Sequence, residues 1–143
     1  VKAHRIIARV LKDVLNQLRA GVTEIEIANF IRYKNLDDAK NILQRVVKKK
    51  QPVPYKRHNK DIPHRKGMMA GRYPVKTSKI ILKLLNSVQA HAQNKGLSSN
   101  LFISQMIVNQ GNKQMHYGRH RGKMKRTHIK IVVKEMEKKN IKK

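Results

Sequence analysis

The sequence predicts an α+β fold, in which helices precede a pair of long strands. Apolar residues recur at helical spacing in four segments between residues 6 and 96. From residue 101 the period changes: residues 101–109 are apolar and β-branched, and residues 127–134 alternate apolar with polar side chains. These two periods distinguish amphipathic helices from strands. Because 143 residues is a usual size for one domain, we expect a single domain over residues 1–143.

The first two expected helices lie on either side of Gly21. Residues 6–20 carry apolar side chains at helical spacing and predict a helix. A second helix is expected from Thr23 to about Tyr33. Thr23 is its expected N-cap, and Glu26, three residues later, is the expected partner in a capping box.

Two further helices have clear start signals. Asn35 is the expected N-cap of a helix that ends near Val47, and two acidic residues follow it in the first turn, where the helix dipole favours them. Pro74 opens the longest helix, because its missing N–H is not needed there, and Gly96 ends that helix. Residues 101–136 are then expected to form an extended β-hairpin whose far end, residues 110–126, leaves the core.

The charge distribution favours nucleic acid as the partner. The chain carries 34 Lys and Arg against 8 Asp and Glu, a formal net charge of +26, and has no carboxylate side chain from residue 62 to residue 134. Acidic proteins and membrane surfaces usually engage one helix face or one short cluster, whereas here the charge covers loops, helices and turns. A membrane-active cationic protein would need aromatic anchors, but aromatic residues are 4% and Trp is absent. We expect no membrane partner.

Two basic segments supply the candidate contacts, a loop over residues 48–73 and the far end of the hairpin. Their Lys and Arg side chains suit phosphates, and their His and Tyr side chains suit unpaired bases, although Tyr55 and Tyr73 fit the core equally well. Irregular loops and a projecting hairpin favour structured RNA over a regular DNA groove. The candidate loop residues are Lys48, Lys49, Lys50, Lys56, Arg57, His58, Lys60, His64, Arg65, Lys66 and Arg72. The candidate hairpin residues are Lys113, His116, Tyr117, Arg119, His120, Arg121, Lys123, Lys125 and Arg126.

The sequence argues against an enzyme and against a metal or cofactor. It contains no Cys, and its central and hairpin regions lack the clustered carboxylates that metal-dependent nucleases need. His116 and His120 are four residues apart, which brings two ligands together only on a helix, but Gly118 interrupts this segment and no third ligand is apparent. We therefore expect no catalytic residues, no metal site and no cofactor.

Several short motifs together resemble one ribosomal protein family. They are VPYKRHN at 53–59, HRKG at 64–67, GRYPVK at 71–76, ILKLL at 81–85 and NKGL at 94–97, with IR at 31–32, NLDDA at 35–39 and THI at 127–129. In combination they resemble the archaeal and eukaryotic branch of the large-subunit family known as L22 in bacteria and L17 in eukaryotes. The resemblance covers about residues 23–136.

The resemblance implies a fold and a place in the ribosome. The implied fold is three helices packed on a small three-stranded antiparallel sheet, with a long protruding β-hairpin. The implied function is that of a structural constituent of the large ribosomal subunit, which binds rRNA and helps line the polypeptide exit tunnel. Candidates for the tunnel tip are Met115, His116, Tyr117, Gly118, Arg119, His120, Arg121 and Gly122.

The implied partners are large-subunit rRNA, neighbouring ribosomal proteins and, at the hairpin tip, the nascent polypeptide. We expect no homo-oligomer, and a cytoplasmic ribosome as the location. The alternative is a nucleic-acid architectural protein outside the ribosome, such as a chromatin or ribonucleoprotein component.

Three departures from the family pattern stand beside the resemblance. Family members have an extended strand before the first helix, where residues 6–20 here show a helical period. Tyr33 occupies the position at which Gly commonly ends that helix, so Asn35 is expected to take over the turn. The hairpin end is several residues shorter than in familiar relatives and lacks their full Arg-rich tip.

Overall fold

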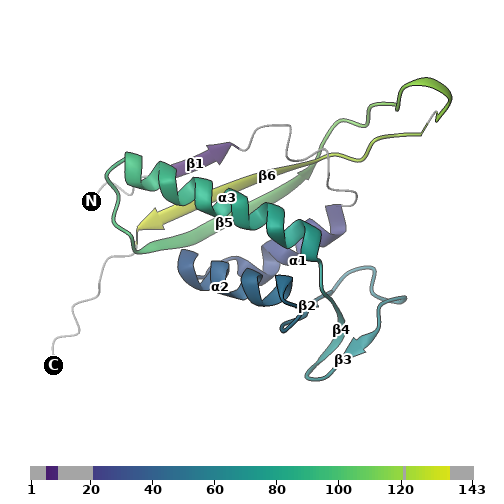
Figure 1. Ribbon diagram of the computed structural model, residues 1–143, viewed down its shortest axis with the longest axis horizontal. Helices are drawn as coiled ribbons and strands as arrows, with labels where there is room; N and C mark the ends of the chain where they lie inside the picture. Colours follow the sequence, from purple (N-terminus) through teal and green to yellow (C-terminus); the bar gives the residue numbers. More distant parts are fainter. Residues whose placement is uncertain (1–5, 10–20, 121, 136–143) are drawn as a thin grey trace.

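The computed structural model of the chain describes residues 6–9, 21–120 and 122–135 (Figure 1). Its helices are α1 (Gly21–Ile31), α2 (Leu36–Val47) and α3 (Val75–Asn94), with a short 3-10 helix, η2 (Gly118–His120). Its strands are β1 (Ile6–Arg9), β2 (Val53–Pro54), β3 (His64–Arg65), β4 (Met68–Arg72), β5 (Leu101–Gln110) and β6 (Thr127–Glu135).

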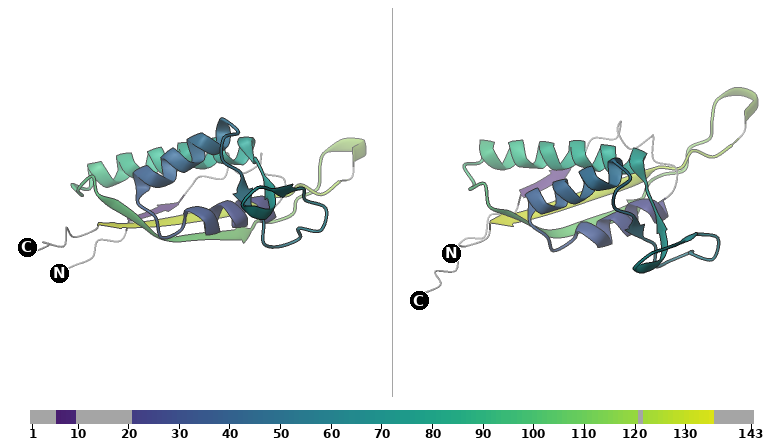
Figure 2. Two further views of the ribbon diagram at one scale, coloured as in Figure 1. Left: turned by 90° about the horizontal axis from the view of Figure 1, so that it is seen from below. Right: turned by 60° about the horizontal axis from the view of Figure 1, so that its bottom comes forward.

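The main sheet is antiparallel and has the strand order β1-β6-β5. Strands β5 and β6 pair along their whole length, from Leu101 opposite Glu135 to Gln110 opposite Thr127. The three helices lie on one face of this sheet (Figure 2), with α1 against β5, α3 against β1 and α2 against α3. The expected α+β architecture of three helices on a three-stranded sheet is confirmed. Its core includes the fully buried Ile27, Ile31, Leu43, Ile81, Leu85, Ile103, Met106 and Ile131.

The predicted helix over residues 6–20 is wrong at its start, because Ile6–Arg9 forms the strand β1. This strand pairs with β6, with Ile6 opposite Val133 and Arg9 opposite Lys130. The ladder with β6 satisfies the backbone groups of β1 that face it, and tertiary pairing of this kind outweighs a weak local helical preference. The remainder of the predicted helix, residues 10–20, lies outside the described residues.

The predicted capping box at Thr23 is also wrong. Helix α1 already begins at Gly21, so Thr23 lies inside its first turn. The Glu26 side chain does not return to the helix start; its Oε1 accepts a hydrogen bond from the backbone N–H of Arg57 at 3.0 Å. The carboxylate therefore fastens the basic segment after β2 to the helix.

The turn after α1 is made by Tyr33 and not by Asn35. Tyr33 adopts a left-handed conformation with φ of 63°, while Asn35 is extended with φ of −62° and ψ of 148°. Two backbone hydrogen bonds to β5 hold this turn: Tyr33 N donates to Ile103 O and Ile103 N donates to Lys34 O, each at 3.0 Å. Asn35 does precede α2 as predicted, but its side chain makes no capping hydrogen bond.

Helix α3 agrees with its sequence signals. Pro74 occupies the N-cap position, and Gly96 has a left-handed φ of 69° just beyond the last turn. Gly96 N donates to Gln93 O at 2.9 Å, and Leu97 N donates to Ala92 O at 3.1 Å. These two bonds form a Schellman motif, for which glycine is favoured.

The basic segment is more ordered than the predicted irregular loop. It contains a second small antiparallel sheet with the order β2-β4-β3, in which Val53 pairs with Arg72 and His64 pairs with Ala70. Buried side chains anchor this sheet to the core, among them Tyr55, which is 7% exposed. Tyr55 is therefore a core residue in this structure and does not present its ring for base stacking.

Candidate nucleic-acid interface

The arms of the hairpin stay paired beyond the ends of β5 and β6. Gly111 N donates to Arg126 O at 2.8 Å, Met124 N donates to Gln114 O at 2.7 Å, and His116 N donates to Gly122 O at 2.8 Å. Met115 and Lys123 form an isolated antiparallel bridge between the same arms. The hairpin is therefore a continuous two-stranded projection that leaves the body of the molecule (Figure 1).

Gly111 makes the close approach of the arms possible at the point where they leave the sheet. A Cβ atom at this position would lie 3.0 Å from Arg126 Cβ, 3.0 Å from His128 Nε2 and 3.2 Å from the backbone carbon of Arg126. Contacts of 3.0–3.2 Å are tighter than most real Cβ contacts, so a side chain at this position would force its neighbours to shift, and glycine avoids this.

The turn of the hairpin coincides with the tip candidates. It lies between His116 and Gly122, which the last backbone hydrogen bond joins, and it contains η2 and the left-handed Gly118 with φ of 67°. Tyr117 is 90% exposed, and Met115 is exposed as well. Arg121 lies outside the described residues, as does the side chain of His120.

The hairpin candidates that the structure describes present their charges to solvent, with one exception. Arg126 is half-buried, and its Nε is buried without a hydrogen-bond partner among the described residues. Its Nη2 contacts Met124 Sδ at 3.7 Å. The exposed candidates are Lys113, His116, Tyr117, Arg119, Lys123 and Lys125.

The loop candidates are distributed over the end of α2 and the small sheet. Lys48, Lys49 and Lys50 follow α2 and are exposed, and Lys49 takes a left-handed φ of 56°. The guanidinium of Arg65 lies 5.3 Å from the centroid of the Tyr73 ring, within the range of a cation–π contact. Arg72 Nη2 donates to the backbone oxygen of Asp61 at 3.4 Å. The other exposed candidates here are Lys56, Arg57, His58, Lys60, His64 and Lys66.

Two buried titratable side chains, Glu24 of α1 and Tyr55 after β2, lie close enough to interact electrostatically. Glu24 is 1% exposed, and its Oε2 has no hydrogen-bond partner among the described residues. Burial raises the pKa of the Glu24 carboxyl above its ordinary value of 4.5, although a backbone hydrogen bond opposes this change. Burial also raises the pKa of the Tyr55 phenol, against a side-chain hydrogen bond with Thr23.

Both basic surfaces lie at the same end of the molecule. In Figures 1 and 2, the hairpin tip and the small sheet project from the end at which α3 begins. The opposite end carries the start of α2, with Asp37 and Asp38 in its first turn, and the end of β6 with Glu135. The exposed cations of the hairpin and of the small sheet are thus gathered at the end from which both project, although Glu24, Glu26 and Asp61 lie there as well.

The described residues contain neither a metal site nor a membrane span. No group of three or more His, Asp or Glu side chains among them is placed to hold a metal ion. None of the described helices is long and apolar enough to cross a membrane.

Comparison with known proteins identifies the family. Residues 24–134 match the family described as Ribosomal protein L22p/L17e. The chain belongs to this family. The hairpin and the small basic sheet are therefore features of an L22p/L17e protein, and the resemblance drawn from the motifs is confirmed.

Archaeal relatives have similar sequences. The large ribosomal subunit protein uL22 of Picrophilus torridus is 45% identical over 101 residues, which cover 65% of this chain and 68% of the relative. The uL22 of Staphylothermus marinus is 34% identical over 144 residues, 91% of this chain and 92% of the relative. The uL22 of Nanoarchaeum equitans is 43% identical over 122 residues, 78% and 70% of the two chains.

Some features of the interface could not be predicted from the sequence. No local sequence pattern predicts the hydrogen bond from Arg57 N to Glu26 Oε1, because the two residues are 31 positions apart. A hollow at the base of the hairpin was also missed, since it joins the first turn of α1 to both hairpin arms. The sequence showed the pattern of basic residues but not the residues that they contact in the folded protein.

Proposed function

We propose that the protein is a structural constituent of the large ribosomal subunit that binds rRNA through the hairpin and the small basic sheet. Membership of a family of ribosomal proteins supports the first part, as do relatives that are large-subunit proteins. The binding role rests on one observation above all. The hairpin remains hydrogen-bonded as far as His116 and Gly122, yet it projects away from the core with exposed cations.

A projection of this kind needs a partner. A two-stranded hairpin without a covering layer is marginally stable in water. The exposed cations on its arms repel one another, and no carboxylate occurs within residues 101–134 to offset them. A surrounding polyanion removes this repulsion, and RNA phosphates supply the charge along the full length of both arms.

The small sheet offers a second set of phosphate contacts. Its backbone is fixed by the ladder to β4 and by the Glu26–Arg57 hydrogen bond, so its exposed Lys and Arg side chains project from a rigid base. Arg side chains bind phosphates as planar forks and Lys side chains as mobile charges. The two surfaces share one end of the molecule, which fits a single RNA partner that encloses both.

At the tip, the proposal extends to the exit tunnel. Residues 115–122 would form part of the tunnel wall, with the exposed Met115 and Tyr117 available to a nascent polypeptide. Neighbouring ribosomal proteins would contact the body, with no membrane partner and no homo-oligomer, and the ribosome concerned would be cytoplasmic.

The salt dependence of RNA binding tests the proposal. The protein would be titrated against a transcript of the large-subunit rRNA of Picrophilus torridus between about 50 and 200 mM salt; six to ten phosphate contacts predict a loss of affinity of about 10³–10⁵-fold. Lys123→Gln should lower the steepness of the plot of log affinity against log salt concentration by about 1, because it removes one phosphate contact. A flat salt curve would exclude phosphates as the main contact, and absence of binding would exclude the proposal.

A further inference from the structure

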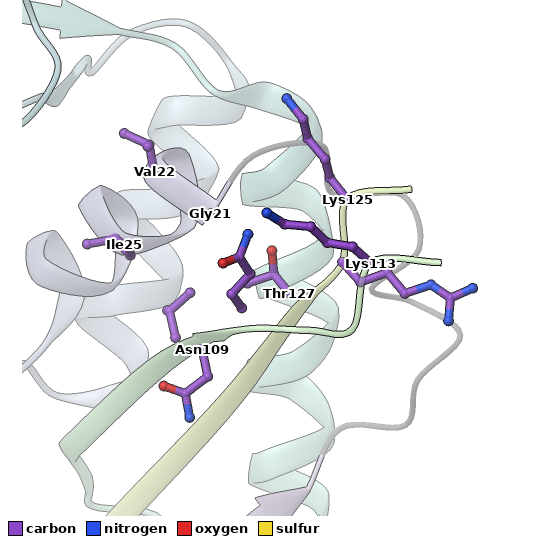
Figure 3. Close-up of a pocket in the computed structure, with 10 residues that line it drawn as sticks. Gly21, Val22, Ile25, Asn109, Lys113, Lys125 and Thr127 are labelled. Atoms are coloured by element: carbon purple, nitrogen blue, oxygen red, sulfur yellow. The ribbon is translucent and has the colours of Figure 1, made fainter. Parts of the chain in front are cut away.

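A pocket lies where the hairpin leaves the body of the molecule (Figure 3). It encloses about 310 Å³ and is lined by the first turn of α1, the end of β5 and both arms of the hairpin. Small-molecule pockets in proteins usually range from about 300 to 1,000 Å³, so this one is of a size for a single small unit and not for a helix.

The walls of the pocket differ in chemistry. Val22 and Ile25 from α1 and Val108 from β5 form an apolar side. The hairpin arms contribute Lys113, Lys125 and Arg126, and no lining residue is acidic. The pocket therefore combines an apolar surface with a concentration of positive charge.

The positive charge is not balanced within the described residues. Lys113 and Lys125 are on opposite arms, each next to the hydrogen-bonded pair Gln114 and Met124, and like charges placed across two strands destabilise each other. Figure 3 shows the Lys113 side chain extending from its arm towards Gly21, the first residue of α1, while the Lys125 side chain extends from the other arm towards the top of the view. The positive end of the α1 dipole adds to the same field. The buried Nε of Arg126, on the same wall, is a hydrogen-bond donor without an acceptor among the described residues.

An anion with an apolar face would satisfy both walls. A nucleotide has this composition, because its phosphate is charged and the faces of its base are apolar. An acidic side chain would balance the lysines but leave Val22, Ile25 and Val108 uncovered. Proteins that read RNA commonly hold single unstacked nucleotides in such sites.

We propose that this pocket binds one unpaired nucleotide of the RNA, with its phosphate between Lys113 and Lys125 and its base against Val22, Ile25 and Val108. The inference rests on the proposed function and deepens it. Because one wall belongs to the body and the other to the hairpin, the bound nucleotide fixes the direction in which the hairpin projects.

The test uses cysteine protection, since the chain contains no cysteine of its own. Val22→Cys places a thiol in the pocket, Asn109→Cys provides a second reporter at its exposed edge, and Ser87→Cys provides a control on the exposed face of α3. Alkylation by N-ethylmaleimide is measured on free protein and on protein saturated with the Picrophilus torridus rRNA transcript. Saturation is verified by filter binding on the same samples.

The pocket reporters should lose labelling in the complex, while Ser87→Cys should label equally in both states. Adding Lys113→Gln and Lys125→Gln together should restore labelling of the pocket thiol in the saturated complex. The charge-matched pair Lys79→Gln and Lys83→Gln, exposed on α3, should leave the protection intact. The double variant Lys113→Gln with Lys125→Gln should lower the slope of log affinity against log salt concentration by about 1, as expected for one phosphate shared by both lysines. Two separate phosphate contacts would lower this slope by about 2.

Three results would overturn the inference, and each has a distinct meaning. Full labelling of both pocket thiols in a saturated complex would show that the pocket stays open while RNA binding stands. Protection in intact large subunits but not by the transcript would assign the pocket to an acidic segment of a neighbouring protein. Failure of the wild-type chain to bind the transcript would remove the proposed function, and the nucleotide site with it.

Discussion

Gly111 lies where the hairpin leaves the body, and its lack of a side chain allows the two arms to approach closely there. The arms approach so closely at this residue that an added Cβ would lie 3.0 Å from Arg126 Cβ and 3.2 Å from its backbone carbon. The carbonyl of Arg126 also accepts the 2.8 Å hydrogen bond from Gly111 N, so a shift of the Arg126 backbone would strain this bond.

Gly111→Ala should therefore lower the free energy of unfolding by about 1–3 kcal/mol, the usual cost of forcing extra volume into a packed site. Denaturant unfolding monitored by circular dichroism measures this change. Asn112→Ala, at the exposed neighbouring position, is the control and should have a much smaller effect. Equal stability of wild type and Gly111→Ala would show that the arms separate readily.

Glu24 makes stability depend on pH. Its pKa is raised by burial, so the folded protein holds a proton on this carboxyl more tightly than the unfolded chain does. Stability contributed by this group therefore falls as pH rises from the ordinary value of 4.5 through the raised pKa, because the folded state must then bury a charge.

Glu24→Gln should remove this dependence and raise the melting temperature at neutral pH relative to wild type. The measurement is the difference in melting temperature between the two proteins as a function of pH. This difference should be smallest near the ordinary glutamate pKa and should grow towards neutral pH. A difference that stays constant with pH would mean that the carboxyl does not titrate abnormally.

Individual residues were the hardest features to predict from sequence. Thr23 and Glu26 have the spacing of a capping box, but helix α1 begins earlier and Glu26 binds the backbone of Arg57 instead. Tyr33 adopts a left-handed backbone conformation that Gly or Asn usually occupies, because backbone hydrogen bonds of Tyr33 and Lys34 with Ile103 of β5 hold it there. In both cases the deciding partner is distant in sequence, so no local pattern could reveal it.

At the scale of elements, the hairpin is the part whose order depends most on a partner. Its arms are joined by backbone hydrogen bonds as far as His116 and Gly122, but no core covers them. Local opening in such a segment requires little free energy.

Trypsin should therefore cleave the free protein first within residues 110–126, with Arg119 in the turn as an early site. Cleavage sites would be identified by mass spectrometry over a short time course. Binding to the rRNA transcript should suppress these cuts, while a control digestion with the RNA degraded should restore them. Uniform resistance of this segment in free protein would contradict the description of a projecting hairpin.

Most elements, in contrast to single residues, were predictable. Helices α2 and α3 and strands β5 and β6 have strong periods and clear end signals, such as Gly96 with its left-handed φ of 69°. Strand β1 was not predictable from the residues alone, since it exists by pairing with β6, more than 100 positions away. The small sheet β2-β4-β3 was hidden by the Pro and Gly residues that also indicate a loop.

At the scale of the whole molecule, the central feature is the excess of positive charge. The chain has a formal net charge of +26, and both basic surfaces lie at the end from which the hairpin projects. Self-repulsion of this size opposes compaction, and a polyanion offsets it. The candidate residues were predictable as a pattern of charge, whereas the hollow between α1 and the hairpin arms required the fold.

Sedimentation through a high-salt sucrose gradient tests the central claim most directly. A tagged form of the protein would be expressed in a native host, and its lysate would be fractionated and blotted across the whole gradient. We expect stoichiometric comigration with large subunits and polysomes, and loss of this comigration after RNase digestion. A peak confined to the light fractions, or association with chromatin, would contradict a role as a constituent of the large subunit.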